Sequence, residues 1–204
     1  MKQSGSDAVV VSRETRARLD SFGELLLRWN RTINLISRKD EAVLWDRHIQ
    51  DALQLLPLMP VGVSVAIDLG SGAGFPGLVL AIASGCHFHL IESDQRKAAF
   101  LREASRLVDA PTTVHAARIE TVHLPPVGLV TARALAPLVD LIGLAMPFLA
   151  PEGVLLAPKG SNVEAELTAA REQWHMRVER ASSTTNAAAS ILQITEVSRV
   201  GSPI

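Results

Sequence analysis

The segment 68–77, Asp-Leu-Gly-Ser-Gly-Ala-Gly-Phe-Pro-Gly, constrains the fold of this chain more than any other part of the sequence. It leaves one apolar run and enters another of helical character, so it joins a strand to a helix. Three alternating glycines allow a tight turn and a close approach of the backbone to a ligand. Pro76 suits a first helical position, where its missing N–H costs nothing. We therefore predict a ligand-binding loop here.

Short apolar strands and helices alternate along the chain after residue 60. We expect strands over 63–68, 87–92, 113–116, 129–132, 153–157, 177–181 and 191–197, and helices from Pro76 and over 95–108, 138–149 and 162–172. This alternation predicts an α/β fold with a seven-stranded, mostly parallel sheet and helices on both faces. Such sheets bind ligands beyond the carboxyl ends of their strands, where the strand order reverses.

The first sixty residues have a different pattern. One helix is expected over 12–35 with Ser12 as its N-cap, and a second over 40–56, ended by Pro57. We interpret residues 1–60 as a helical extension packed on the core, and residues 61–204 as a Rossmann-like domain.

The start of the chain has no apolar segment typical of a secretory signal, and no apolar run reaches the ~20 residues of a membrane span. Cys86 is the single cysteine, which excludes a disulfide framework. The histidines show no metal-ligand spacing. We therefore expect a cytoplasmic protein with no bound metal and no membrane contact.

Two ligands compete for the glycine loop. Gly72, Gly74 and Gly77 match the dinucleotide fingerprint G-x-G-x-x-G. However, Pro76 removes an N–H where a pyrophosphate would need it, and Asp68 adds a repelling charge. The pattern Asp-x-Gly-x-Gly-x-Gly is typical of the S-adenosylmethionine loop of Rossmann-like methyltransferases, and we favour that interpretation.

Two further segments fit an adenosine-containing ligand. Glu92 ends the second strand, 22 residues after Gly70, where its carboxylate can accept from both ribose hydroxyls. This position suits a nicotinamide cofactor equally well. After the third strand, segment 116–120 offers an apolar wall and an acid for an adenine ring, although a capped turn with a surface Glu fits the spacing nearly as well.

The segment after the fourth strand lacks the groups that other methyl acceptors require. Asn/Asp-Pro-Pro-aromatic, common in amine methylation, is absent, and Cys86 lies too far away to act as a nucleophile. Guanine N7 already carries an available lone pair and needs no base. Arg133 is the candidate catalytic residue because its fork can pair with guanine O6 and N7. It could instead bind a carboxylate or phosphate, or serve as a structural residue at the strand end.

The charge balance argues against a nucleic-acid partner. The formal net charge is −1 and the pI is about 6.6, whereas nucleic-acid-binding domains usually have a pI above ~9. The chain also lacks Tyr. The basic residues nevertheless comprise 16 Arg and four Lys, and Arg is the better ligand for phosphate and guanine.

Taken together, these segments resemble the GidB/RsmG family of bacterial methyltransferases, which act on N7 of a guanine in small-subunit ribosomal RNA. The resemblance covers almost the whole chain, through segments 29–37, 47–53, 68–77, 92–101, 117–120, 131–134 and 158–160. It implies a Rossmann-like class I fold, S-adenosyl-L-methionine as cofactor, and 16S rRNA or the small ribosomal subunit as partner. With the loop, the expected cofactor site comprises Asp68, Gly70, Gly72, Gly74, Phe75, Glu92, Ile119, Glu120 and Arg133.

The resemblance also implies a basic face for RNA, which the net charge requires to be local. The candidates are Arg28, Arg31, Asn34, Arg38, Arg47, His48, Arg96, Lys97 and Lys159. His48 and Asp51 are three residues apart, so they share a helix face, and we expect a paired His at an interface. Of Asn30 and Asn34, one is expected to shape the turn after the first helix.

Two rival functions remain open at this point. One is a nicotinamide-dependent oxidoreductase, and the other is an RNA-binding module without catalytic activity. We expect a monomer without a stable protein partner.

Overall fold

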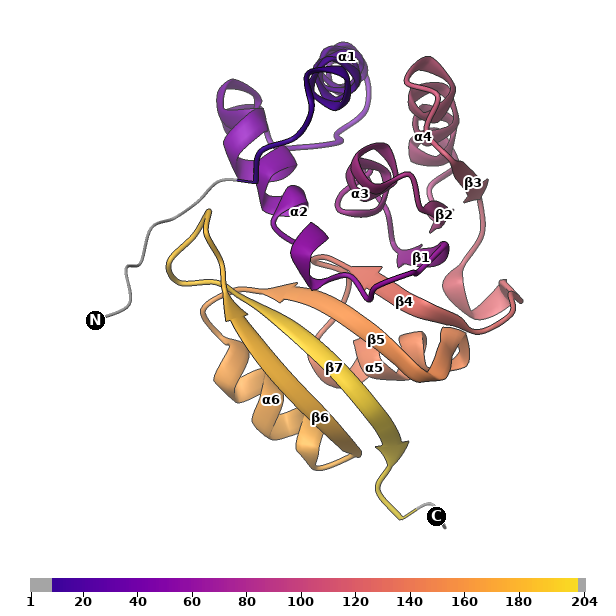
Figure 1. The fold of residues 1–204 in the computed structure, drawn as a ribbon, viewed down its shortest axis with the longest axis vertical. Coiled ribbons are helices and arrows are strands. Elements are labelled where there is room, and N and C mark those ends of the chain that lie inside the picture. Colours follow the sequence, from indigo (N-terminus) through magenta and orange to yellow (C-terminus); the bar gives the residue numbers. More distant parts are fainter. Residues whose placement is uncertain (1–8, 202–204) are drawn as a thin grey trace.

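A computed structural model describes residues 9–201 of the chain. Its seven strands form one sheet in the order β3-β2-β1-β4-β5-β7-β6 (Figure 1). The strands are β1 Val65–Leu69, β2 His87–Ile91, β3 Thr112–His115, β4 Val127–Ala132, β5 Leu149–Lys159, β6 Trp174–Ser182 and β7 Ser190–Arg199. Strands β1 to β5 pair in parallel, and β7 runs antiparallel to β5 and β6. The predicted mostly parallel sheet is confirmed.

Helices cover both faces of the sheet (Figure 1). They are α1 Arg13–Asn30, α3 Gly77–Ser84 and α4 Gln95–Leu107 on one face, and α5 Leu138–Ala145 and α6 Val163–Arg171 on the other. Successive residues of β1 enter different cores, because side chains alternate along a strand. Ala66 belongs to the core shared with α1, α3 and α4, and Ile67 to the core shared with α5 and α6.

The first helix begins as predicted and ends early. Ser12 is its N-cap and accepts a hydrogen bond from the Thr15 amide. The helix stops at Asn30 instead of residue 35, because the Asn30 Oδ1 accepts from the amides of Leu35 and Ile36 at 2.8 and 3.0 Å. The expected turn-shaping asparagine is therefore Asn30.

The single helix predicted over 40–56 is wrong. The chain instead forms four short pieces: 3₁₀ turns η1 Arg38–Val43 and η3 Leu56–Leu58, the π-helical segment η2 Trp45–Gln50, and α2 Asp51–Leu53. Local propensity favours a continuous helix here, but side chains of η2 and α2 contact the end of β4, and this tertiary contact prevails. Wide π-helical turns are often found at functional sites.

The N-terminal segment shares a core with the helices beside it. The Phe22 ring in α1 packs on Phe75 and Phe100, with centroids 5.6 and 6.2 Å apart. Phe75 belongs to the glycine loop, so this packing places the extension next to the loop. Within residues 9–201, no helix is long and apolar enough to cross a membrane.

The strand order reverses between β1 and β4. Strand β1 lies between β2 and β4, so the connections that leave β1 and β4 diverge at the carboxyl edge of the sheet. In open α/β sheets this reversal creates a crevice for ligands. The glycine loop follows β1 and Arg133 follows β4, so both reach this crevice.

Candidate functional site

The glycine loop needs its glycines because of its backbone conformation and because a neighbouring side chain leaves no room for a Cβ. Gly70, Gly72 and Gly74 have φ values of +64°, +54° and +91°, a region that other residues enter at a cost. A Cβ added at Gly70 would also lie 2.6 Å from the Leu135 side chain. Pro76 stands one position earlier than predicted, at the N-cap of α3 instead of its first turn.

Asp68 lies beneath this loop and not in the ligand crevice. Its side chain is fully buried, and Oδ1 accepts a 2.6 Å hydrogen bond from the Thr131 hydroxyl of β4. A Cβ added at Gly77 would lie 2.5 Å from the Asp68 side chain, so α3 can start here only with a glycine. Burial raises the Asp68 pKa to about 6. Asp68 therefore supports the loop from behind.

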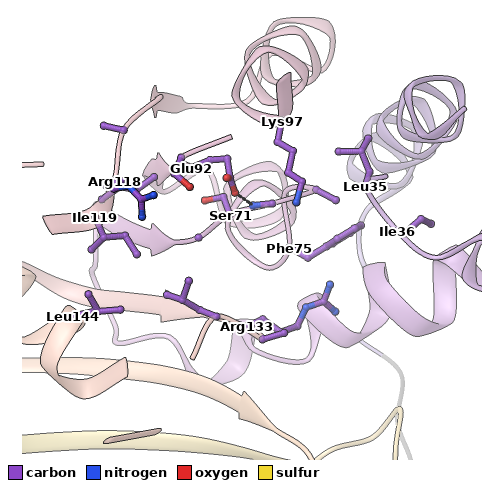
Figure 2. A pocket seen from close by; sticks show the side chains of 18 of the residues that line it. Leu35, Ile36, Ser71, Phe75, Glu92, Lys97, Arg118, Ile119, Arg133 and Leu144 are labelled. Atoms are coloured by element: carbon purple, nitrogen blue, oxygen red, sulfur yellow. Dashed lines mark hydrogen bonds between the residues drawn. The ribbon is translucent and has the colours of Figure 1, made fainter. Parts of the chain in front are cut away.

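A cavity of about 420 Å³ opens above the loop (Figure 2). Its wall includes Gly70, Gly72, Phe75, Glu92, Ile119, Glu120 and Arg133, that is, the predicted cofactor residues other than Asp68 and Gly74. The wall also contains Leu35, Ile36, Ser71, Lys97, Arg118 and Leu144. Ser71 and Arg118 were not among the predicted cofactor residues, although both lie inside the segments that carry the resemblance.

Glu92 holds a fixed orientation at the end of β2. Its Oε2 accepts a 2.8 Å hydrogen bond from the Gly72 amide, and its Oε1 accepts a 2.7 Å bond from the Asp94 amide. Each carboxylate oxygen can accept a second hydrogen bond. Two acceptors held this way suit two adjacent hydroxyl groups, as the sequence predicted for a ribose.

A second, wider hollow of about 1180 Å³ adjoins the first. Both are lined by His48, Arg133, Ala134 and Leu135. The other walls of the second hollow come from the N-terminal extension, the end of β5, and the hairpin between β6 and β7. Two neighbouring cavities with a shared wall can hold two reactants side by side, as a group transfer requires.

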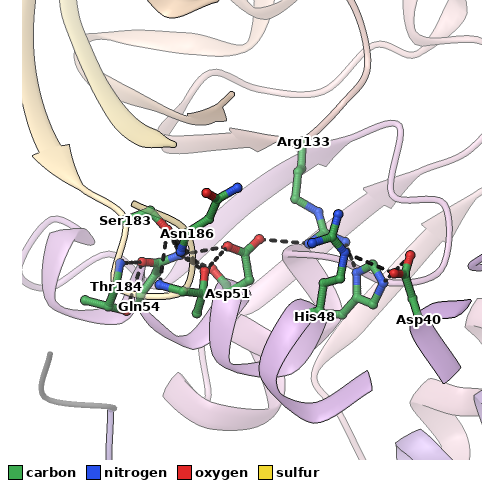
Figure 3. Close-up of polar contacts among 10 residues, drawn as sticks. Asp40, His48, Asp51, Gln54, Arg133, Ser183, Thr184 and Asn186 are labelled. Atoms are coloured by element: carbon green, nitrogen blue, oxygen red, sulfur yellow. Dashed lines mark hydrogen bonds and ion pairs between the residues drawn. The ribbon is translucent and has the colours of Figure 1, made fainter. Parts of the chain in front are cut away.

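Arg133 stands in this shared wall, held by two partners (Figure 3). Its Nη1 donates to Asp51 Oδ2 at 2.9 Å, and its Nη2 lies 3.1 Å from His48 Nδ1. Arginine can only donate, so Nδ1 accepts and the His48 proton sits on Nε2, which faces Asp40 Oδ2 at 3.6 Å. Burial and the Arg133 charge lower the His48 pKa, so its ring is neutral at neutral pH.

The Phe75 ring packs against both His48 and Arg133. The His48 ring stacks on Phe75 with centroids 5.1 Å apart, and the Arg133 guanidinium carbon lies 5.0 Å from the same ring centroid. His48 and Asp51 were expected to sit at an interface with the His paired. They do join the extension to the core, but each contacts Arg133.

The RNA candidates fall into three groups. His48 and Lys97 line the first cavity, and Arg47 and Lys159 line the second hollow along with His48. Exposed residues outside both cavities are Arg28, Arg31, Asn34, Arg38 and Arg96. Three of the Arg and Lys candidates have carboxylate partners: Arg47 with Asp40 at 3.0 Å, Arg96 with Asp94 at 3.7 Å, and Lys159 with Glu166 at 2.7 Å.

Lys159 differs from the surface cation that the sequence suggested. Its side chain is only 10% exposed, and its Nζ donates to Glu166 Oε2 at 2.7 Å and to the Ala136 carbonyl at 2.9 Å. Glu166 also accepts from the Leu138 amide. The pair therefore clamps the turn between β4 and α5, and the expectation of a freely exposed charge here is corrected.

Two further groups bear on the chemistry available. Cys86 is buried at the start of β2, and burial raises the pKa of its thiol. Within residues 9–201, no three His, Cys, Asp or Glu side chains are placed to hold a metal ion.

The sheet order, the glycine loop after β1 and the carboxylate at the end of β2 define a class of protein: the Rossmann-like, S-adenosylmethionine-dependent methyltransferases. A solved structure with the same fold is the O-methyltransferase from Bacillus cereus in complex with SAH. It superposes with a TM-score of 0.60 at 14% identity and covers 86% of this chain and 91% of its own.

Within this class the chain belongs to the GidB family, described as rRNA small subunit methyltransferase G, which it matches over residues 15–195. It is 55% identical over 190 residues to a ribosomal RNA small subunit methyltransferase G of Granulibacter bethesdensis, covering 93% of this chain and 89% of that protein. It is 56% identical over 210 residues to the protein of that name from Acidiphilium cryptum, covering 96% and 97%. The oxidoreductase alternative is therefore wrong.

Proposed function

We propose that this chain transfers a methyl group from S-adenosylmethionine to N7 of a guanine in 16S ribosomal RNA, in line and without a general base. The observation that carries the proposal is the position of Arg133 between the two cavities. Within residues 9–201 its hydrogen bonds use Nη1 and Nη2, one each, while a guanidinium offers five N–H donors. Donors remain for O6 of a guanine, and a hydrogen bond to O6 leaves the N7 lone pair free to accept the methyl group.

The first cavity fits the cofactor. Its volume of about 420 Å³ lies within the ~300–1,000 Å³ usual for small-molecule sites. Gly70 and Gly72 let a ligand approach the backbone, Glu92 accepts from ribose hydroxyls, and Ile119 forms an apolar wall for adenine. When bound, S-adenosylmethionine supplies a methyl group on a good leaving group.

The residues around Arg133 support a mechanism without a base. His48 Nδ1 is engaged by Arg133, and Cys86 is buried away from both cavities. Guanine N7 needs no deprotonation, so the protein has to align the acceptor and exclude water. We assign Arg133 to alignment, and the stacked side chains of Phe75 and His48 to the wall that keeps it in place.

The second hollow is where we place the target nucleotide. Its volume of about 1180 Å³ leaves room for a nucleotide, and Arg47 is part of its wall. We assign Arg28 and Arg31, which are exposed, and Lys97, which lines the first cavity, to contacts with the flanking RNA. A substrate of this kind, 16S rRNA or an assembling small subunit, places the reaction in the cytoplasm, and we expect one chain to act as a monomer.

Nucleoside analysis of ribosomal RNA tests this proposal. Cells that lack the protein are complemented with the wild type or with Gly72→Asp, and 16S rRNA is digested and analysed by chromatography and mass spectrometry. We expect 7-methylguanosine to return at one position with the wild type alone. A methyl group on another atom of guanine would overturn the N7 assignment, and RNA binding without any methyl transfer would support the non-catalytic alternative.

A further inference from the structure

We propose that Asp51 is a positioning residue for methyl transfer: it holds the Arg133 guanidinium in the wall between the cavities and ties it to the β6–β7 hairpin. This inference rests on the proposed function. Asp51 lines only the second hollow, so it acts on the reaction through Arg133 and not through the cofactor site.

The two oxygens of Asp51 have separate partners (Figure 3). Oδ1 accepts from Thr185 Oγ1 at 2.7 Å and from Gln54 Nε2 at 2.9 Å. Oδ2 accepts from Arg133 Nη1 at 2.9 Å. Because Oδ1 is fixed by two donors, the plane of the carboxylate is fixed too, and Oδ2 is aimed at Arg133.

The β6–β7 hairpin is bound by Asp51 and by its neighbour Gln54. Gln54 is buried, and its Oε1 accepts from the Thr184 amide at 2.8 Å and from the Thr184 hydroxyl at 3.1 Å. Thr184 and Thr185 form part of the wall of the second hollow. One carboxylate therefore connects three segments: the extension, the end of β4 and the hairpin tip.

The pair is shielded enough for its geometry to matter. The side chains of Arg133 and Asp51 are 19% and 18% exposed. Removal of one partner of a shielded ion pair leaves the other charge uncompensated, so Arg133 would turn toward water. Loss of alignment by about 1 Å can cost on the order of 100-fold in rate. His48 alone, as a neutral acceptor on Nη2, leaves the guanidinium free to pivot about that one bond.

A double-mutant cycle tests the inference. We measure single-turnover methyl transfer to small-subunit RNA, with saturating S-adenosylmethionine, for wild type, Asp51→Ala, Arg133→Ala and the double variant. Asp51→Ala should lower the rate by about 10- to 100-fold and should cost nothing further in the Arg133→Ala background. Asp51→Asn keeps an oxygen acceptor for Arg133 and should recover part of the rate. Thr185→Val, which removes one of the two donors to Oδ1 and leaves Arg133 on Oδ2, should lose less than Asp51→Ala.

Three measurements separate this role from a general structural one. Calorimetric affinity for S-adenosylhomocysteine should stay within about threefold in Asp51→Ala, because Asp51 does not line the cofactor cavity. Asp20→Ala, which removes a carboxylate from an exposed pair with Arg16, is the matched control and should leave the rate unchanged. Equal losses from Asp51→Ala with and without Arg133, or a wild-type rate in Asp51→Ala, would overturn the inference. A wild-type protein that transfers no methyl group would instead overturn the proposed function.

Discussion

The Gly72 amide and the Glu92 carboxylate are joined by a 2.8 Å hydrogen bond that links the glycine loop to the end of the neighbouring strand. The loop and the acid that we propose for the ribose are therefore one structural unit. The Gly72 amide donates to Glu92 Oε2 and so holds the carboxylate in one orientation. The remaining lone pairs of Glu92 then point toward the cavity. A change at Gly72 should consequently disturb two parts of the cofactor site at once.

Gly72→Asp should abolish binding of S-adenosylhomocysteine in calorimetry. The variant places a second carboxylate beside Glu92 and a side chain at φ +54°. Gly85→Asp is the matched control, since Gly85 has φ +72°, has open space around it, and lies outside both cavities. Gly85→Asp should lose stability but keep its affinity. Undiminished affinity in Gly72→Asp would contradict the site.

Asp68→Asn should change how stability depends on pH. The Asp68 pKa is raised from 3.8 to about 6, so the folded protein holds this proton more tightly than the unfolded chain does. Stability from this group is therefore lost as pH rises from about 4 to 6 and is level above that window. Between pH 4.5 and 7, urea unfolding should show the wild type losing roughly 2 kcal/mol relative to the variant.

Asp94→Asn should show the opposite sign when the urea series is extended below pH 3.8. Hydrogen bonds from the amides of Lys97 and Arg96 lower the Asp94 pKa. Its stabilising contribution is present at neutral pH and is lost as the pH falls through the folded-state pKa. For Asp68, identical pH profiles of stability in the wild type and Asp68→Asn would show that burial does not raise the pKa of this carboxyl.

Lys159→Met should destabilise the fold without weakening the electrostatic part of RNA binding. The change leaves Glu166 without its cation, at a cost of about 3 kcal/mol, and Lys159→Met with Glu166→Leu should recover most of it. Urea unfolding measures both. A normal stability together with a smaller salt dependence of RNA affinity would instead make Lys159 a phosphate contact.

Arg31→Ala and Lys97→Ala should each weaken RNA binding and reduce its dependence on salt. Each phosphate contact contributes about 0.7–0.9 to the slope of log K against log salt concentration. The control is Arg177→Ala, because Arg177 is also exposed but lies on β6 beside Glu179 and Glu196. Filter binding from low to moderate salt measures the slopes, and equal slopes for Arg31→Ala and the wild type would remove Arg31 from the interface.

Local signals in the sequence predicted much of the fold. Ser12 caps α1, as expected, and Asp94 caps α4 in the same way, because capping depends on residues within one turn. The glycine loop and Glu92 were also predicted to lie together, since parallel strands place their carboxyl ends at one edge. The alternation of strands and helices was enough to indicate the architecture.

Contacts between distant segments could not be predicted from the sequence. Asp51 meets Thr185 across 134 positions and Arg133 across 82, and such pairings leave no periodic trace. The broken helix after residue 38 follows from those contacts. For the same reason the partner of Lys159 and the burial of Asp68 were missed, because burial depends on the whole fold and not on the identity of a charged residue.

The packing of Gly70 against Leu135 couples the glycine loop to the turn after β4. Here a single added carbon at Gly70 would lie 2.6 Å from Leu135, and Leu135 is part of the wall of both cavities. A larger residue at position 70 would therefore displace a side chain that lines both cavities, so the shape of the second hollow depends on the size of a residue in the glycine loop.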